Sequence, residues 1–483
     1  MSNSRELHVA ILASPGIGHL NPVLRLGRRL TTLVNNIKVT ILVVSSTMSP
    51  PTSTLLQSLG VEKEAEIEII GLPPVDISHL ITPTTQVVTQ ICMINREALP
   101  AVKSTIAAMN NRPDALIVDL FGTEAIPIAK EFNIPKYVFI TTNAWNTTLW
   151  VYVQVLDKQV QGQYLDQEEP FEIPGCKPVR PEIVVDPMWD REDQRYFEYL
   201  RVGMELSLSD GVMINTWEEL EPVSIRALRQ NEVLHGILKV PVYPIGPLSR
   251  PAEPSGLKDE EVRKWLDKQQ ADSVLYVSFG SGGTLSAEQI IELAWGLELS
   301  NQKFIWVVRP PIDGSFDGAF FSVGETGSSN DGPRFLPPGY TSRVQERGLL
   351  LPIWGQQVEI LNHKSVGGFM SHCGWNSTLE TIAAGVPIIG WPLYAEQALN
   401  ATMLSQELGV AICPDVLPGR TIVLRQEIAI MVRRVMGEKD GKIMREKIRM
   451  LQESGKNALS EGASSYNSMI EVVRDIELRL SES

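Results

Sequence analysis

Cysteine is scarce in this chain, which has four cysteines among 483 residues. Cys92, Cys176, Cys373 and Cys413 are scattered and include no Cys-x-x-Cys pair. Reduced thiols fit this spacing better than a disulfide framework or a zinc site. We therefore expect a reducing compartment, and a cytoplasmic location is the simplest choice.

The chain also lacks an excess of positive charge and long apolar runs. Asp and Glu outnumber Lys and Arg by 57 to 43, for a formal net charge of -14. This balance disfavours nucleic acid as a partner, because nucleic-acid phosphates are bound mainly through Lys and Arg. No stretch reaches the roughly 18 apolar residues of a membrane-spanning helix. The first residues, MSNSRELHVAILASPG, have only a short apolar run, so we expect neither a secretory signal nor an integral membrane segment.

Short apolar, β-branched segments recur along the chain in two series, with helical stretches between them. The first series comprises residues 8–13, 38–44, 115–120, 136–141 and 211–217. The second series comprises residues 274–280, 303–308, 348–354, 367–372 and 387–392. Such alternation is typical of parallel sheets built from βαβ units. Because 483 residues are too many for one ordinary core, we predict an α/β fold with two doubly wound domains.

Proline and glycine mark the predicted boundary between the two domains. The stretch VPVYPIGPLSRPAEPSG, within residues 233–256, lacks helical periodicity and is typical of a linker. The predicted layout is a first domain over residues 1–240, a linker over 241–256, a second domain over 257–464 and a terminal helix over 465–483. Apolar residues recur at helical spacing in the terminal helix, so one of its faces must be packed.

A stretch rich in Gly, Ser and Asp, residues 311–335, departs from the regular alternation. Its composition favours a surface loop in the second domain. A tolerated insertion is the favoured interpretation, and a lid over a site at the neighbouring strand end is the alternative.

Two polar residues stand at the carboxyl ends of predicted strands in the first domain. His19 lies in SPGIGHLNP, directly after the strand at 8–13, and Asp119 interrupts the apolar run ALIVDL. A buried carboxylate needs a partner, so Asp119 could cap the following helix or accept the Nδ1–H of His19. His19 could face a bound molecule, or it could be a helix-capping or solvated histidine. If the two residues meet, they form a general base oriented by a carboxylate.

The stretch FMSHCGWNSTLE, residues 369–380, passes from an apolar strand into small polar residues and then into a helical pattern. The start of a helix offers unpaired backbone N–H groups and the positive end of the helix dipole. Such a junction favours an anion, above all a phosphate. Open parallel sheets bind ligands at the carboxyl ends of their strands. We therefore predict a phosphate site at this junction.

A longer segment around this junction carries a family resemblance. The run WGQQVEILNHKSVGGFMSHCGWNSTLETIAAGVPIIGWPLYAEQ, from Trp354 to Gln397, resembles the signature box of plant UDP-sugar glycosyltransferases without a gap. SPGIGHLNP, ALIVDLFG and VLYVSFGS also match, so the resemblance covers essentially the whole chain. It implies the GT-B fold, in which two Rossmann-like domains face each other across a cleft and the C-terminal helix returns to the first domain. SPGIGHLNP and VDLFGTEA are similar to the branch that acts on hydroquinone, monolignols and related small phenols.

The resemblance implies roles for individual residues. The nucleoside positions are Trp354, Gln357 and Glu380; Trp354 would stack on uracil, although by itself it would be interpreted as a core tryptophan. The diphosphate positions are Ser281, His372, Gly374, Asn376 and Ser377. The sugar positions are Trp375, Glu396 and Gln397, with a hydroxyl from Thr141 or Thr142 of the first domain. Glu380 suits the ribose diol because each carboxylate oxygen can accept a hydrogen bond.

Two further details of the box bear on the donor. A terminal Gln after an acidic residue resembles glucose-preferring members, whereas a terminal His is associated with galactose, so the implied donor is UDP-glucose. The box usually opens Trp-Ala-Pro-Gln, but here Gly355 and Gln356 occupy the two middle positions. Losing that proline loosens the turn in principle.

The predicted function is an inverting O-glucosyltransferase that moves glucose from UDP-glucose to a hydroxyl of a small aromatic acceptor of the phenol, hydroquinone, monolignol or indoxyl type. His19 would take the acceptor proton, Asp119 would balance the charge, and the helix start at residues 374–377 would stabilise the leaving UDP. Phe121, Trp145 and Trp150 could form the walls of the acceptor pocket or pack in the core. We expect no metal and no other cofactor, because this chemistry requires none and the chain has no Asp-x-Asp pair.

Two rival classes give different expectations. A dehydrogenase would need a G-x-G-x-x-G turn followed about 20 positions later by an acidic residue, and SPGIGHLNP does not fit. A nucleotide-sugar-binding sensor without turnover is the alternative. The presence of both His19 and Asp119 disfavours a sensor, since a pure binder needs no base. We expect a monomer.

Overall fold

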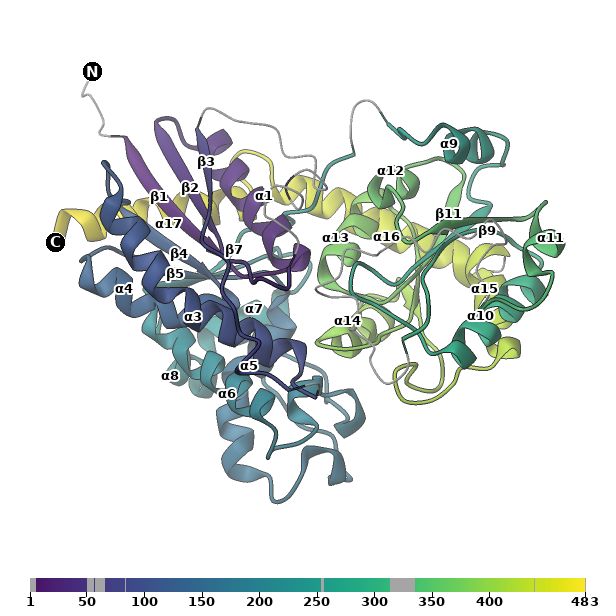
Figure 1. Cartoon of the computed structure of the whole chain (residues 1–483), viewed down its shortest axis with the longest axis horizontal. Coiled ribbons are helices and arrows are strands. Elements are labelled where there is room, and N and C mark those ends of the chain that lie inside the picture. Colours follow the sequence, from purple (N-terminus) through teal and green to yellow (C-terminus); the bar gives the residue numbers. More distant parts are fainter. Residues whose placement is uncertain are drawn as a thin grey trace. The chain divides into compact units, whose positions relative to one another are not determined.

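The structure is a computed structural model that describes residues 6–49, 56, 66–82, 84–252, 256–312, 335–437 and 439–482 (Figure 1). The chain divides into two compact units, which we call unit 1 (residues 1–248 and 455–483) and unit 2 (residues 249–454). Each unit is built on one parallel sheet, which confirms the predicted fold class. The predicted domain limits remain a prediction. Most of the predicted 311–335 loop, residues 313–334, lies outside the described residues.

Unit 1 contains, in the described part of the chain, a seven-stranded sheet with the order β3-β2-β1-β4-β5-β6-β7. The strands are β1 (Leu7–Ala13), β2 (Ile37–Val43), β3 (Ile67–Gly71), β4 (Ala115–Asp119), β5 (Lys136–Ile140), β6 (Gly211–Ile214) and β7 (Val242–Pro244). All neighbouring pairs are parallel, and Ile11 of β1 pairs with Ile41 of β2 and Ile117 of β4. Every residue of β1 is buried, as expected for a central strand covered on both faces.

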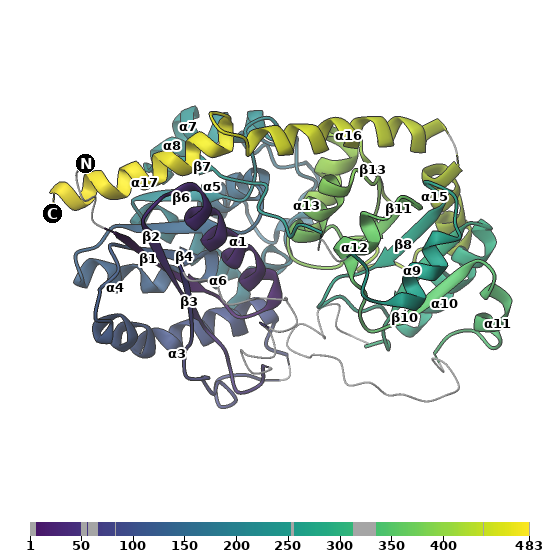
Figure 2. The same ribbon diagram turned by 90° about the horizontal axis from the view of Figure 1, so that it is seen from above.

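The helices of unit 1 cover this sheet. They are α1 (Ile17–Leu33), α3 (Val87–Ala108), α4 (Ile126–Glu131), α5 (Ala144–Gln159), α6 (Gln194–Glu205), α7 (Pro222–Gln230), α8 (Glu232–Leu238) and α17 (Ser464–Glu482). The terminal helix α17 runs beside β7 (Figure 2). Its residues Met469, Val472 and Ile476 belong to the same buried cluster as β1, so its apolar face is packed in the core of unit 1.

Unit 2 contains, among the described residues, a six-stranded sheet with the order β10-β9-β8-β11-β12-β13. The strands are β8 (Val274–Ser278), β9 (Lys303–Val308), β10 (Gly348–Pro352), β11 (Val366–Ser371), β12 (Ile388–Gly390) and β13 (Ala411–Ile412). The described α-helices are α9 (Glu260–Asp267), α10 (Ala287–Ser300), α11 (Tyr340–Val344), α12 (Gln357–Leu361), α13 (Trp375–Ala384), α14 (Gln397–Thr402), α15 (Arg425–Gly437) and α16 (Lys439–Ala458), whose last four residues belong to unit 1. All neighbouring strands are parallel.

Parallel strands bring their carboxyl ends to one edge of each sheet. In unit 1 the adjacent strands β1 and β4 therefore deliver the α1 start and Asp119 to the same edge. In unit 2 the neighbours β9, β8 and β11 deliver the segments that follow residues 308, 278 and 371. Ligand sites of open α/β sheets lie at such edges.

Candidate active site

His19 and Asp119 meet at the edge of the unit 1 sheet. The Nδ1 atom of His19 lies 3.0 Å from Oδ2 of Asp119. Asp119 is fully buried, whereas the His19 side chain keeps 14% of its surface exposed. Because a carboxylate only accepts hydrogen bonds, Nδ1–H is the donor, and Nε2 is the ring nitrogen that can take a proton. The two residues thus have the geometry of an oriented general base.

Local backbone structure fixes both residues of this pair. Gly16 precedes α1 with a φ of 103°, a conformation that glycine adopts readily and other residues rarely do. His19 consequently falls in the first turn of α1. Asp119 ends β4 and also caps the following helical turn, since its Oδ1 accepts from the backbone N–H of Phe121 at 3.2 Å. The sequence left two alternatives for Asp119, capping the following helix or pairing with His19. In the structure Asp119 does both.

Aromatic side chains adjoin the pair on one side. The Phe121 ring meets the His19 ring edge-on at a centroid distance of 5.2 Å, and Trp150 lies 6.1 Å from Phe121. Trp150 stacks on Tyr199 and donates from Nε1 to the Tyr199 carbonyl at 3.2 Å. Trp145 is almost wholly buried. Phe121 is therefore next to His19, while Trp145 and Trp150 are held in the core.

Thr141 and Thr142 follow β5 at the same edge of the sheet, and both are buried. The next helix, α5, is anchored by Glu221, a residue that the sequence did not single out. Its carboxylate accepts from the backbone N–H groups of Ala144 and Trp145, at 3.0 and 2.8 Å. Glu221 thus supplies acceptors to the start of α5, where backbone donors have no helical partner.

In unit 2, the polar junction predicted from the sequence is the start of α13. Gly374 is the residue before the helix; as a glycine it supplies no side-chain cap, and the first turn of α13 contains no acidic residue. Trp375 and Asn376 are the first two helical residues, followed by Ser377. The helix therefore carries no acidic residue of its own at the positive end of its dipole, which suits an anionic ligand.

His372 lies three residues before the first residue of α13, and its ring is close to Gly280 and Gly374. A Cβ atom placed on Gly280 or on Gly374 would lie 2.5 Å from its Nε2. Burial, with a smaller contribution from the cation of Arg309, lowers the pKa of His372 to about 4, so the ring is neutral at pH 7. Its Nδ1 is buried and has no hydrogen-bond partner among the described residues. A neutral imidazole can donate one hydrogen bond to a phosphate oxygen.

Three of the residues predicted to bind UDP-glucose form a hydrogen-bonded cluster. The side-chain amide of Gln357 donates to Oγ of Ser377 at 2.9 Å and to the carboxylate of Glu380 at 2.7 Å. Trp354, three residues before Gln357, exposes 53% of its surface. Such an exposed indole is available for stacking, and the core alternative for Trp354 does not apply.

The unusual opening of the signature box has its own contacts. The side-chain oxygen of Gln356 accepts from the backbone N–H groups of Lys258 and Asp259, at 2.8 and 3.1 Å. Gly355 is closely surrounded, because a Cβ atom there would lie 3.2 Å from a methyl group of Leu351. Gln356 thus supplies hydrogen bonds at the position where the family usually has a proline.

The predicted sugar residues Glu396 and Gln397 lie at the start of α14. Gln397 is buried, and its side-chain oxygen accepts from the backbone N–H groups of Leu393 and Tyr394, at 2.9 and 3.2 Å. Asn400, which the sequence did not single out, donates to the carbonyl of Cys373 at 2.9 Å. The Asn400 contact joins α14 to the segment just before α13.

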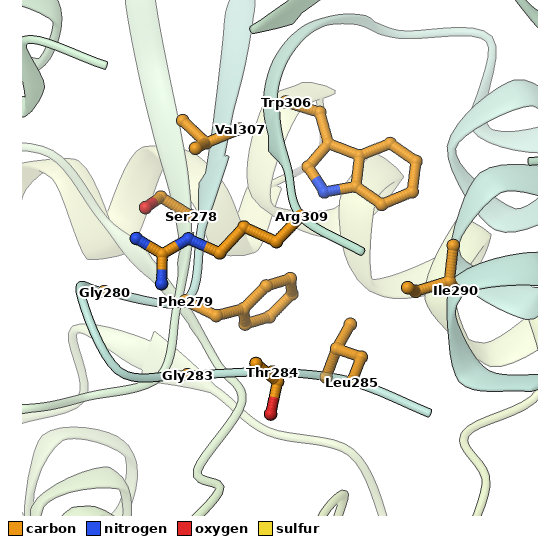
Figure 3. A pocket seen from close by; sticks show the side chains of 10 residues that line it. All are labelled: Ser278, Phe279, Gly280, Gly283, Thr284, Leu285, Ile290, Trp306, Val307 and Arg309. Carbon is orange, nitrogen blue, oxygen red and sulfur yellow. The ribbon is translucent and has the colours of Figure 1, made fainter. Parts of the chain in front are cut away.

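Ser281 lies in the loop after β8, and its neighbour Gly280 lines a recess that is partly open to solvent (Figure 3). The carbonyl of Ser281 accepts a hydrogen bond from the guanidinium of Arg309. Arg309 follows β9 and is another residue that the sequence did not single out. No group of three or more His, Cys, Asp or Glu side chains suited to a metal ion occurs among the described residues.

Fold and site together define a class of protein. A nucleotide-sugar transferase of the GT-B type has two parallel-sheet units. Here unit 1 carries an imidazole–carboxylate pair at the edge of its sheet, and unit 2 carries a helix start suited to phosphate at the edge of its own sheet. None of the helices that the structure describes is long and apolar enough to cross a membrane.

Comparisons with known proteins give the family. Residues 223–417 match the family described as "UDP-glucoronosyl and UDP-glucosyl transferase". The chain is 52% identical over 462 residues to anthocyanidin 3-O-glucosyltransferase 5 of Manihot esculenta, covering 96% of this chain and 94% of that one. It is 39% identical over 479 residues to the hydroquinone glucosyltransferase of Rauvolfia serpentina, covering 99% of both.

A solved structure agrees with these relatives. The crystal structure of TcCGT1 in complex with UDP matches with a TM-score of 0.91 and 47% identity, over 98% of this chain and 100% of that one. The chain therefore belongs to the family of UDP-glucuronosyl and UDP-glucosyl transferases, which confirms the resemblance in its sequence. It is an enzyme, a UDP-glucosyltransferase of the hexosyltransferase class.

Proposed function

We propose that this enzyme is an inverting O-glucosyltransferase that moves glucose from UDP-glucose to a hydroxyl of a small aromatic acceptor. The observation that carries the proposal is the contact of 3.0 Å between His19 and the fully buried Asp119. The relatives named for anthocyanidin 3-O and hydroquinone glucosylation both act on aromatic hydroxyls, which supports this acceptor class.

The base of the reaction is His19. Its Nε2 takes the proton of the acceptor hydroxyl while the acceptor oxygen attacks the anomeric carbon, and Asp119 balances the charge of the resulting imidazolium. A phenol eases this step, since its pKa near 10 is much closer to that of imidazole than an alkyl alcohol's is. Phe121, whose ring meets that of His19, gives the acceptor an apolar neighbour.

The leaving group is UDP, and its proposed site lies in unit 2. Its diphosphate binds at the start of α13 and at His372, where backbone N–H groups and a neutral imidazole donate hydrogen bonds. Asn376, Ser377 and Ser281 add polar groups. Trp354 stacks on uracil, and Glu380, oriented by Gln357, accepts from the ribose hydroxyls.

The sugar is held by Trp375, Glu396 and Gln397, with a hydroxyl from Thr141 or Thr142. The anchoring of Gln397 by two backbone N–H groups supports a fixed role at this end of the box. Direct displacement turns the α-linked donor into a β-glucoside, and no step requires a metal. We also propose a monomer in the cytosol, which the four free cysteines support.

The acceptor class is tested by product analysis. The protein is incubated with UDP-glucose and a panel of hydroquinone, coniferyl alcohol, indoxyl and an alkyl alcohol, and glycosides are identified by mass spectrometry. We expect glucosides of the aromatic hydroxyls and little of the alkyl alcohol. The His19→Ala variant serves as the matched control. Turnover of the alkyl alcohol at the rate of the phenols would contradict the proposal.

A further inference from the structure

Arg309 occupies a central place in the sheet of unit 2. It directly follows β9, and β9 lies between β8 and β10. A long side chain at the end of β9 can therefore reach the segments after both neighbouring strands. Figure 3 shows the Arg309 side chain extending along the recess, with its guanidinium on the side of Ser278 and Gly280 and away from the indole of Trp306.

The guanidinium donates to one backbone carbonyl on each side. Nη1 donates to the carbonyl of Ser281, in the segment after β8, and Nε donates to the carbonyl of Ile353 at 3.2 Å, in the segment after β10. Among the residues that the structure describes, no carboxylate pairs with Arg309. Its partly buried charge is thus held by neutral carbonyls, which do not neutralise it as an ion pair would.

The contact with Ile353 falls on a strained turn. Ile353 has a φ of 65°, which is rare for a β-branched residue, and the N–H of Trp354 donates to the carbonyl of Pro352 at 2.7 Å. The N–H of Ile353 donates to the carbonyl of Val308 at 2.9 Å. Such a conformation persists only when its surroundings hold it, and here β9 and Arg309 do so. The turn directly precedes Trp354, the proposed uracil platform.

We propose that Arg309 is a positioning residue of the donor site: its guanidinium holds the Ser281 loop and the Ile353 turn in one arrangement, so that the diphosphate and uracil subsites are set together. This inference rests on the proposed function, which places UDP in unit 2. Lysine cannot replace arginine in this role, because a single ammonium lacks the planar fork that donates in two fixed directions.

The test compares two ligands, UDP and uridine, by titration calorimetry with the full-length protein. Arg309→Lys keeps the charge but loses the fork, and we expect its affinity to fall about tenfold or more for both ligands. Arg445→Lys is the matched control: Arg445 also bridges two backbone carbonyls in unit 2, those of Gly367 and Val435, each at 3.0 Å. We expect the control to bind both ligands as the wild type does.

A second variant separates positioning from general damage. Glycine adopts a positive φ without strain, so adding Ile353→Gly to Arg309→Lys should restore uridine affinity to within about threefold of wild type while UDP binding stays weak. Circular dichroism and thermal unfolding of each variant check that it folds.

Several results would overturn the inference. Wild-type affinity of Arg309→Lys for both ligands would remove the role altogether. A loss confined to UDP would show that Arg309 acts on the phosphates alone, and a double variant without recovery of uridine binding would refute the strained-turn argument. If the wild-type protein bound no UDP, the proposed function itself would fail, whereas tight wild-type binding with an unaffected Arg309→Lys would refute only this inference.

Discussion

Replacing Asp119 by asparagine tests the proposed base with the least disturbance of the fold. The carboxylate accepts two hydrogen bonds, from Nδ1 of His19 at 3.0 Å and from the N–H of Phe121 at 3.2 Å. The asparagine oxygen can still accept from Phe121, so the helical turn after β4 keeps its cap. The contact with His19 then involves a neutral amide, which no longer balances an imidazolium.

The size of the effect follows from this single lost interaction. A hydrogen bond to a charged group contributes about 1.5–3 kcal/mol, which corresponds to roughly 10- to 150-fold in rate. The asparagine NH2 group also favours the tautomer with hydrogen on Nε2, which removes the lone pair that accepts the proton. General-base catalysis is worth about 10²–10⁴-fold in total. We therefore expect kcat to fall by roughly 10²–10³-fold, with an unchanged KM for UDP-glucose.

The assay measures initial rates with hydroquinone and with 4-nitrophenol. Because 4-nitrophenol is far more acidic, it needs less help from a base, and we expect a much smaller loss with it. Asp114→Asn is the matched control, since Asp114 is also a buried aspartate that accepts a backbone N–H, that of His8 at 2.9 Å, but at the other end of β4. A wild-type kcat for Asp119→Asn, or an equal loss with both acceptors, would refute the reasoning.

Three further predictions concern His19, Glu380 and His372. His19→Ala should leave UDP affinity within about twofold of wild type by calorimetry and lower kcat for weakly acidic phenols by about 10²–10⁴-fold; normal turnover would remove His19 as the base. Glu380→Ala should raise the KM for UDP-glucose about tenfold, and an unchanged KM would contradict the ribose contact. Because the pKa of His372 is lowered from 6.5 to about 4 in the folded protein, only the unfolded chain takes up this proton between those pH values. The free energy of unfolding of the wild type should thus fall by up to about 3 kcal/mol as the pH drops from 6.5 to 4. Urea unfolding at pH 7 and pH 5 should show a smaller fall for His372→Gln than for the wild type. An identical pH dependence of the two proteins would refute this assignment.

Strand ends explain why much of the candidate site could be predicted. His19 follows β1 and Asp119 ends β4, and because these strands are neighbours in a parallel sheet, the two side chains meet at one edge. The start of α13 was predicted by the change from apolar to small polar residues after β11. The family resemblance then supplied Gln357, Ser377 and Glu380, which the structure joins by hydrogen bonds.

Contacts with backbone groups account for much of what the sequence did not reveal. Arg309 and Glu221 act on carbonyls and N–H groups, which every residue carries, so no partner residue type signals such a contact. The short edge strands β3, β7 and β13 also went unpredicted. In β3 each residue is at least partly exposed, and β7 and β13 have three and two residues, too few for a hydrophobic pattern.

The central claim is a single displacement at the anomeric carbon of UDP-glucose by an aromatic hydroxyl. The most direct measurement is proton NMR of the glucoside that forms first from UDP-glucose and hydroquinone, recorded during the reaction. The account predicts the β-anomer, formed by the wild type and strongly reduced with His19→Ala. An α-glucoside as the first product would contradict it.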